Sequence, residues 1–342
     1  MVLGVLGAAV AAPGRAGAAL RTWMLPKGAE KRAPRAPPDL FTEGGKALVG
    51  VAPGGDPDRG VEEAVALIGG LDRLALAGKT VLVKPNVVSG RGPPTTTSPA
   101  VVGAVVRRLY RAGARKVYVG DMSAMLTLST RRNMEGTGLR RAAEDAGAEV
   151  VAFEDSGWVE VPVPGARHLD RVYVTEWVYR VDRIVNLPVV KTHRSASYSI
   201  CLKNFVGCTH LKQRPYLVDS AHWEEVVAEL NLAYRPDLNV VDATVSMIEG
   251  GPWKGAAAAT NLIVASGDRV AADAFGVGLI RSFGRWEPVG KKPVWEQRQL
   301  RRALELGLGR PRRGIALRVG RGEGGFAALV ERARAQAELE AG

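Results

Sequence analysis

The segment 186–207, NLPVVKTHRSASYSICLKNFVG, holds the densest group of chemically active side chains in the sequence. It contains Lys191, His193, Lys203 and Asn204. An imidazole titrates near neutral pH, so it can transfer a proton or ligate a metal. Lysine ammonium groups are common partners of phosphate and carboxylate groups. These residue types predict a site that binds a small anion and moves a proton on it.

Further polar residues follow short apolar runs of the kind that form buried strands. The runs 80–83, 116–119 and 238–241 lead into Lys84 and Asn86, into Asp121, and into Asp242. In an open α/β sheet, ligands bind at the carboxyl ends of the strands. Each residue alone is as compatible with a cap or a turn, but together they predict one polar crevice.

Two other segments are candidates for ligand contact. Thr97 and Ser98 close the run TTTS before a predicted helix, where amides and hydroxyls can bind an anion; capping alone would explain Ser98. The segment 247–255, MIEGGPWKG, places Gly250 and Gly251 in a loop whose backbone can approach a ligand closely. It has neither a Walker loop nor a dinucleotide fingerprint, so a plain surface turn is the alternative.

We predict His193, Lys191 and Asp121 as catalytic residues, with His193 moving the proton. Substrate binding is assigned to Lys84, Asn86, Thr97, Ser98, Lys203, Asn204, Asp242, Gly250 and Gly251. The reaction is either proton abstraction beside a carbonyl or a redox step with an external cofactor. His193 and His210 lie too far apart in sequence for a compact metal motif, so metal and cofactor stay unassigned.

The elements that must position these residues alternate between strand and helix. This alternation predicts an α/β fold with a largely parallel open sheet and helices on both faces. The stretch 158–178 has β-like runs without a helix between them, which predicts a small β-rich insertion. The α/β domain is expected over 46–320, followed by a helical tail over 321–342.

The N-terminal region is expected to lie outside this domain. Residues 1–20 are apolar and contain the small-residue pattern of a signal-peptidase site, although no basic residue opens them. The run is too short for a permanent membrane span. Residues 21–45 read as a linker. We therefore expect export to the periplasm or envelope, with a cytoplasmic location as the alternative.

The formal net charge of +12 raises the question of a nucleic-acid partner. The basic residues are scattered and no nucleic-acid-binding motif accompanies them, so no nucleic-acid partner is expected. The only cysteines are Cys201 and Cys208, too few for a four-cysteine iron–sulfur cluster. A helix between them would keep the thiols too far apart to bridge, whereas a loop would allow a disulfide.

Several motifs in this order resemble the uncharacterised domain of unknown function 362 family. They are VLVKPNVV, TTTSPAVV, VGDMS, VNLPVVKTH, CLKNFVG, VVDATVSMIEGGP and ASGDRVAADAFG, which span about residues 47–320. Many members resemble iron–sulfur proteins through an added ferredoxin-like module, which this chain lacks. Other members carry twin-arginine export signals. The resemblance implies no settled activity. An enzyme acting on a small anion and an envelope protein that binds an anion or metal without turnover are therefore the two hypotheses.

Overall fold

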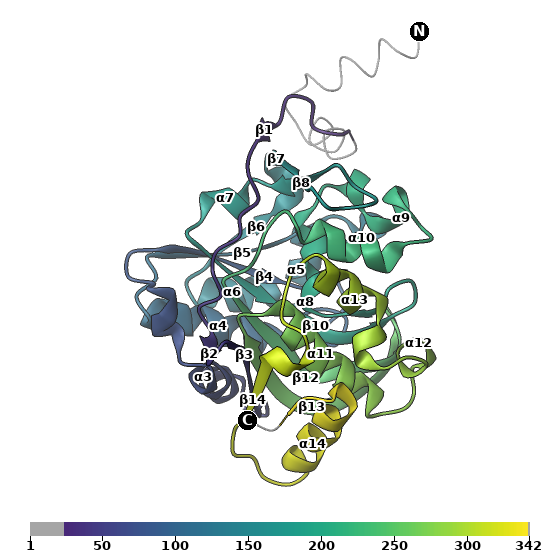
Figure 1. Ribbon diagram of the computed structural model, residues 1–342. Helices are drawn as coiled ribbons and strands as arrows, with labels where there is room; N and C mark the ends of the chain where they lie inside the picture. The colour runs from purple at the N-terminus through teal and green to yellow at the C-terminus, as the bar shows by residue number, and fades with distance from the viewer. Residues whose placement is uncertain (1–23, 341–342) are drawn as a thin grey trace.

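The computed structural model describes residues 24–340, and an 11-stranded sheet forms its centre (Figure 1). The main path of this sheet runs in the order β14 (Ile315–Val319), β3 (Lys46–Pro53), β13 (Gly255–Ser266), β12 (Leu238–Gly250), β9 (Arg183–Leu187), β4 (Thr80–Pro85), β5 (Lys116–Asp121) and β6 (Glu149–Ala152). Three strands pair beside this path: β10 (Val189–His193), β11 (Ser197–Ser199) and β2 (Thr42–Glu43).

Helices cover both faces of the sheet, as predicted. One face carries α3 (Pro57–Leu67), α4 (Pro99–Arg111), α5 (Thr130–Gly136) and α6 (Leu139–Asp145). The other face carries α8 (Cys201–Asn204), α10 (Trp223–Leu230), α11 (Arg269–Arg281), α13 (Arg298–Glu305) and α14 (Phe326–Ala337). The short helices α7 (Trp177–Arg180), α9 (Pro215–Val218) and α12 (Glu287–Gly290) lie in connections.

Alternation along β4 shows how one strand serves both faces. Val81 and Val83 pack into the core beneath α3 and α4, whereas Leu82 belongs to the opposite core. All three side chains are fully buried, because successive side chains of a strand point to opposite sides. The continuous apolar run then ends at Lys84, which places the first polar residue at the strand's carboxyl end.

Most strand pairs of the sheet are parallel, but β12–β13, β13–β3, β10–β11 and β2–β3 are antiparallel, and the long β12–β13 hairpin was not predicted from the sequence. Strands β4, β5, β6 and β9 pair in parallel, but β12 and β13 pair antiparallel from Asn239–Ser266 to Gly250–Gly255. The segment 247–255 is therefore the end of two long strands rather than a free loop. The half of β13 before Thr260 is alanine-rich and largely exposed, and alanine carries little strand propensity.

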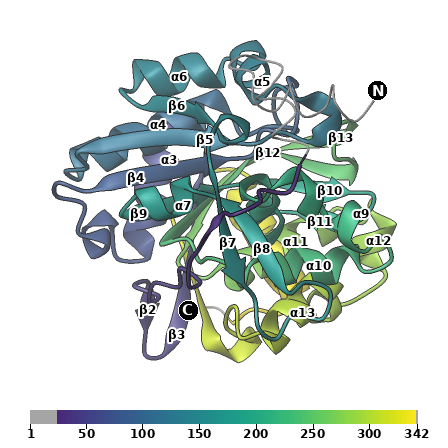
Figure 2. The same cartoon turned by 90° about the horizontal axis from the view of Figure 1, so that it is seen from above.

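The predicted insertion is a separate three-stranded sheet. In it, β7 (Trp158–Pro162) and β8 (Arg171–Thr175) form a hairpin (Figure 2), and β1 (Glu30–Lys31) pairs in parallel with β7 (Figure 1). Part of the predicted linker thus adds strands to both sheets, since β2 pairs with β3. The predicted signal-like residues 1–20 lie outside the described part of the chain.

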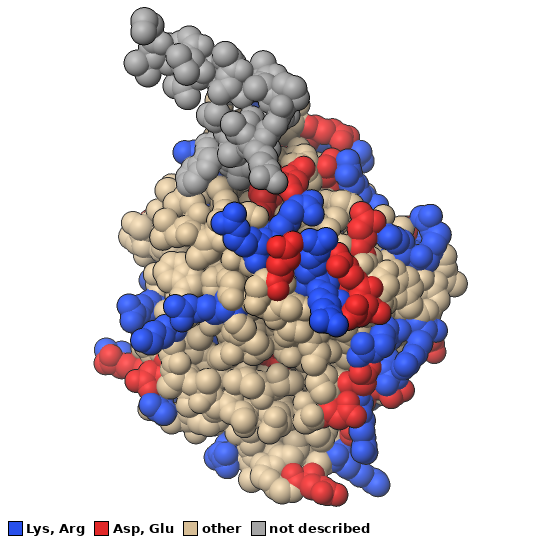
Figure 3. Space-filling model, turned by 180° about the vertical axis from the view of Figure 1, so that it is seen from behind, with Lys and Arg blue, Asp and Glu red and all other residues tan. Residues whose placement is uncertain are grey.

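The surface charge and the helices concern two further expectations, that the protein has no nucleic-acid partner and no permanent membrane span. On the face drawn in Figure 3, basic side chains lie beside acidic ones rather than in one continuous basic patch. Within residues 24–340, no helix combines the length and the hydropathy that crossing a bilayer requires. At the tail, α14 packs against α11.

Candidate functional site

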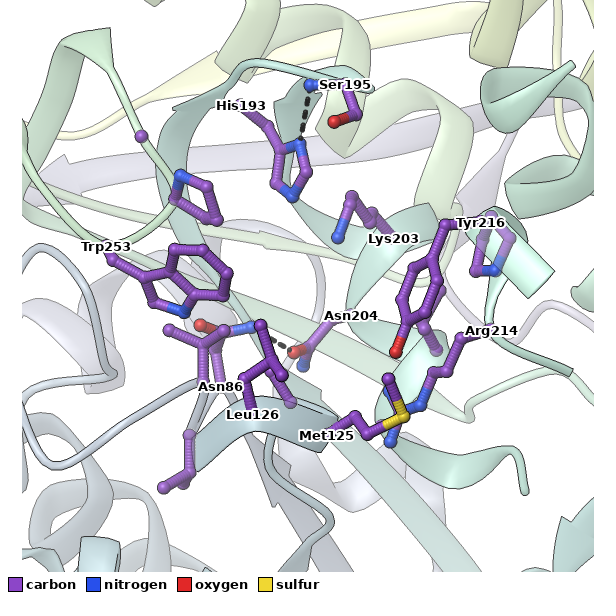
Figure 4. Close-up of a pocket in the computed structure, with 18 of the residues that line it drawn as sticks. Asn86, Met125, Leu126, His193, Ser195, Lys203, Asn204, Arg214, Tyr216 and Trp253 are labelled. Carbon is purple, nitrogen blue, oxygen red and sulfur yellow. Dashed lines mark hydrogen bonds between the residues drawn. The ribbon is translucent and has the colours of Figure 1, made fainter. Parts of the chain in front are cut away.

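A pocket of about 510 Å³ opens at the carboxyl ends of β4, β5 and β10 (Figure 4). This volume suits a small organic molecule. The predicted residues that line it are Lys84, Asn86, Asp121, His193, Lys203, Asn204 and Gly251. The structure therefore brings together most of the residues that the strand ends predicted.

The floor of the pocket is a buried ion pair. Lys84 Nζ lies 2.6 Å from Asp121 Oδ1, and neither side chain is more than 3% exposed. Lys84 also donates to Pro85 O at 2.8 Å and to Asn204 Oδ1 at 3.2 Å. The Asp121 carboxylate accepts from the Val87 and Met122 amides at 2.7 and 2.8 Å. Because a buried pair needs such additional partners, Lys84 and Asp121 are held in place by the protein itself.

A chain of four asparagine amides continues from this floor into the sheet. Asn86 Nδ2 donates to Asn204 Oδ1 at 3.0 Å, Asn204 Nδ2 to Asn186 Oδ1 at 2.8 Å, and Asn186 Nδ2 to Asn239 Oδ1 at 3.0 Å. The last amide, Asn239 Nδ2, donates to Ser266 O at 3.1 Å. The chain connects α8 to β4, β9 and β12, so it fixes the helix that carries Lys203 and Asn204.

Gly207 lets the backbone pass directly over the ion pair. A Cβ at this position would lie 2.0 Å from Asp121 Oδ1 and 2.6 Å from Lys84 Nζ. Neither atom can move without losing its hydrogen bonds. We expect Gly207→Ala to lower the free energy of unfolding by about 1–3 kcal/mol, the usual cost of overpacking.

Urea unfolding of the variant measures this effect. Gly55→Ala is the matched control, because a Cβ there meets no atom within 4 Å and a surface substitution changes stability by less than about 0.5 kcal/mol. Equal stability of both variants would contradict the tight contact at Gly207.

The upper wall of the pocket carries Lys203. Unlike the ammonium of Lys84 on the floor, the Lys203 ammonium is not held by hydrogen bonds. Among residues 24–340, its ammonium makes no hydrogen bond or ion pair, and it lies 5.5 Å from the centre of the Trp223 ring. Burial, and then the charges of Arg214 and Lys84, lower the pKa of Lys203 from 10.5 to about 7. An amine with such a pKa is partly neutral at physiological pH, so it can accept a proton.

His193 faces the same space from the end of β10 (Figure 4). Its Nδ1 accepts hydrogen bonds from the Ser195 and Ala196 amides, both at 3.2 Å. Burial, followed by the charge of Lys203, lowers the pKa of His193 well below 6.5. The ring is therefore neutral, and because Nδ1 is an acceptor, Nε2 carries the proton. In its resting state His193 presents an N–H donor to the pocket.

Several pocket residues carried no signal in the sequence analysis. Arg214 is buried and donates to Met122 O at 3.2 Å, while its Nε has no hydrogen-bond partner in the described structure. Apolar and aromatic side chains complete the walls: Met125, Leu126, Tyr216, Trp223 and Trp253. They come from separate segments of the chain, and Trp223 begins α10. No periodic pattern in these segments distinguishes a pocket residue from any other.

Besides Gly250, four predicted residues lie outside the pocket lining. Lys191 Nζ is buried between Asn86 Oδ1, at 2.5 Å, and Thr95 O, at 2.8 Å. Burial and the charge of Lys203 hold the pKa of Lys191 well below 10.5. It therefore contacts the predicted substrate-binding Asn86 instead of open space.

The other three form the junction of α4 with β12. Asp242 Oδ2 accepts from the Ser98 amide at 2.7 Å, at the N-cap of α4. Thr97 Oγ1 accepts from the Asn86 amide and donates to Leu187 O. The Ser98 amide at this helix start is thus directed at a protein carboxylate, and Thr97 of the run TTTS positions Asn86.

Gly250 and Gly251 end β12 with positive φ angles of 82° and 83°. Gly251 lines the pocket, and a Cβ there would lie 2.1 Å from Thr192 O. Glycine at this position allows the hairpin end to pack against the strand that carries His193. Gly250 does not line the pocket.

Cys201 and Cys208 are free, buried thiols. Burial raises the pKa of Cys201 well above 9.0 and that of Cys208 to about 12. Both thiols are therefore protonated and poor nucleophiles. Cys201 contributes through its backbone instead, because its amide donates to Asp273 Oδ1 at 2.6 Å.

Comparisons with known proteins agree with the motifs. The family model described as domain of unknown function (DUF362) matches residues 81–278. The thylakoid-associated protein sll1697 of a Synechocystis species is 26% identical over 213 residues, covering 60% of this chain and 64% of that protein. The chain thus spans less than two thirds of the length of that relative.

Two solved structures show distant similarity. A Thermotoga maritima protein is 15% identical with a TM-score of 0.37, over 56% of this chain and 52% of that one. The lactate racemase apoprotein of Thermoanaerobacterium thermosaccharolyticum is 10% identical with a TM-score of 0.34, over 86% and 87%.

Proposed function

The chain belongs to the family described as domain of unknown function DUF362, and from the geometry of its pocket we propose that it is an enzyme acting on a small organic anion. The proposal rests on a difference in hydrogen bonding between the residues of the pocket floor and those of its wall. Lys84, Asp121 and Asn204 are held by protein contacts, whereas Lys203 and the His193 Nε2–H face the cavity without a hydrogen-bonding or ionic partner in the described structure.

The charge of the pocket supports an anionic ligand. Five basic residues line it, namely Lys84, Arg194, Lys203, Arg214 and Lys254, against the single carboxylate of Asp121. The Lys84–Asp121 pair is mutually neutralised, so the remaining excess is positive. Aromatic and aliphatic walls beside these cations favour a ligand with both an anionic group and an apolar part.

We propose proton abstraction beside a carbonyl as the reaction class. Neutral Lys203 takes the proton, and the His193 Nε2–H donates a hydrogen bond to the oxygen on which negative charge develops. A lysine base and a neutral histidine donor are both established solutions to this chemistry. In this proposal His193 donates a hydrogen bond, whereas the sequence analysis predicted that His193 moves the proton.

Hydrogen exchange in D₂O tests the reaction without knowledge of the product. Purified protein is incubated with a panel of carboxylates that carry a C–H beside a carbonyl and an aliphatic or aromatic substituent. We expect ¹H NMR to show loss of that C–H signal for at least one compound. His193→Ala should slow the exchange by about 10²–10³-fold, the usual cost of removing one donor to a developing oxyanion, with little change in melting temperature. An unchanged rate in this variant would refute the role of His193.

The second candidate is an envelope protein that binds an anion without turnover. It is favoured by one observation: Lys191 and Asp121, two of the three residues predicted to be catalytic, are engaged in internal contacts. Ligand-induced thermal stabilisation without any hydrogen exchange would support this candidate over the enzyme.

A further inference from the structure

A second group of reactive side chains lies outside the pocket, between the β7–β8 hairpin and the connection from α9 to α10. His168 Nδ1 lies 3.1 Å and His222 Nδ1 2.8 Å from the same atom, Asp219 Oδ2. All three ligand atoms are within 4.8 Å of one another. Among the histidine, cysteine, aspartate and glutamate side chains of residues 24–340, these three converge closely enough to hold one ion.

We propose that His168, Asp219 and His222 form a zinc site. Two imidazole nitrogens and one carboxylate oxygen are a frequent set of protein ligands for Zn²⁺. Metal–ligand bonds of about 2.0–2.2 Å in a tetrahedron separate neighbouring ligand atoms by roughly 3.3 Å. The two contacts to Asp219 need to open by only a few tenths of an ångström to reach that spacing. The set is poor for Mg²⁺ and Ca²⁺, which prefer oxygen ligands.

The ligands are already held by a second layer of contacts. Asp219 Oδ1 accepts from the Ala221 and His222 amides at 3.0 and 3.2 Å, which turns Oδ2 toward both imidazoles. On the hairpin side, the Arg167 and His168 amides donate to the buried Glu229 carboxylate, both at 2.9 Å. Such outer contacts orient ligands before a metal arrives.

Both imidazole rings already lie against the shared Asp219 carboxylate. The two imidazole rings are stacked, with centroids 4.7 Å apart and an angle of 26° between their planes. Without metal, the shared carboxylate can satisfy both Nδ1–H groups. When Zn²⁺ binds, each neutral imidazole would carry its proton on Nε2 and offer Nδ1 to the metal. At least one coordination position would go to water, because the protein supplies three ligands.

The position of the site suggests what the metal does. Tyr216 and Trp223, which line the pocket, flank the segment 219–222 in sequence. A metal bound to Asp219, His222 and the hairpin residue His168 would tie this segment to the second sheet. We infer a structural clamp that fixes the pocket wall carrying Tyr216 and Trp223.

Metal analysis of the untagged full chain tests the proposal. The protein is equilibrated with Zn²⁺, passed through a desalting column and analysed for zinc. We expect one zinc per chain. Replacement of Zn²⁺ by Co²⁺ should give the visible absorption bands of a four-coordinate ion, and binding should change the fluorescence of the neighbouring Trp223.

Three variants remove one ligand each: His168→Gln, Asp219→Asn and His222→Gln. We expect each to weaken zinc binding by more than the roughly 10–100-fold that loss of an outer contact costs. Asp219→Asn is the most informative, since its amide oxygen can still accept the Ala221 and His222 amides and preserve the loop. His193→Gln is the matched control, a histidine of the pocket that should leave zinc affinity unchanged.

Each possible outcome of these measurements either supports or overturns the zinc proposal. Absence of stoichiometric zinc in the wild-type chain would overturn the proposal. Full binding in the three ligand variants, or loss of binding only in His193→Gln, would also overturn it and place the metal elsewhere. The readout is bound metal rather than turnover, so the result is independent of the proposed enzymatic function.

Discussion

Replacement of Lys84 by methionine is expected to lower the free energy of unfolding by about 3–5 kcal/mol. The side chains of Lys84 and Asp121 are no more than 3% exposed, and the ion pair is 2.6 Å long. Methionine fills a similar volume but leaves the Asp121 carboxylate buried without its cation. The two amides that Asp121 accepts from compensate only part of that charge. Urea unfolding measures the loss.

The exposed pair Lys79–Asp182 provides the matched control. Its atoms are 3.7 Å apart, and its side chains are 44% and 41% exposed, so Lys79→Met should cost less than about 1 kcal/mol. The double variant Lys84→Met/Asp121→Asn should recover part of the loss, because it removes both charges. A cost for Lys84→Met as small as that for Lys79→Met would show that the buried pair does not stabilise the floor.

Replacement of Lys203 by glutamine is expected to slow the proposed hydrogen exchange by about 10²–10⁴-fold, the usual contribution of a general base. In the wild-type protein, the rate should rise with pH through about 7, because the neutral form of Lys203 takes the proton and its pKa is lowered to about 7. The variant should lose this rise. Its melting temperature should not fall, because the Lys203 ammonium makes no hydrogen bond to the described chain.

Two further variants distinguish the role of Lys203 as a general base from the role of its positive charge in anion binding. Lys203→Arg keeps a cation that does not deprotonate in this pH range, so it should retain anion binding and lose turnover. Lys212→Gln removes an exposed lysine outside the pocket lining and should change neither property. Turnover in Lys203→Arg close to that of the wild type would exclude Lys203 as the base and leave it a binding role.

The sequence predicted the pocket best where local pattern and topology coincide. Lys84 and Asp121 follow apolar strands whose neighbours in the sheet are parallel, so their convergence follows from the fold class alone. Lys191 and Asp242 follow the same rule and yet do not line the pocket. Lys191 contacts Thr95 O, and Asp242 accepts from the Ser98 amide. Both partners are distant in sequence, and the position of a residue after an apolar strand does not specify them.

The remaining features arise from tertiary structure. Burial beside Arg214 makes Lys203 a potential base, and nothing near Lys203 in the sequence identifies Arg214 as its neighbour. The β12–β13 hairpin was missed because its alanine-rich half lacks the β-branched and aromatic residues that indicate a strand. His168 and the pair Asp219/His222 are about fifty residues apart, so only the fold reveals that they meet.

The chain of asparagine amides has a direction. It begins at Lys191 Nζ, which donates to Asn86 Oδ1, and ends at the Ser266 carbonyl, which can only accept. Rotating any amide between them would place two donors or two acceptors face to face, so the two ends set the orientation of every link. None of these amides titrates, and the chain therefore keeps one orientation of its dipoles as the pH changes. Lys203 on the wall, whose pKa is lowered to about 7, therefore gains and loses its proton beside a row of dipoles that does not reorient.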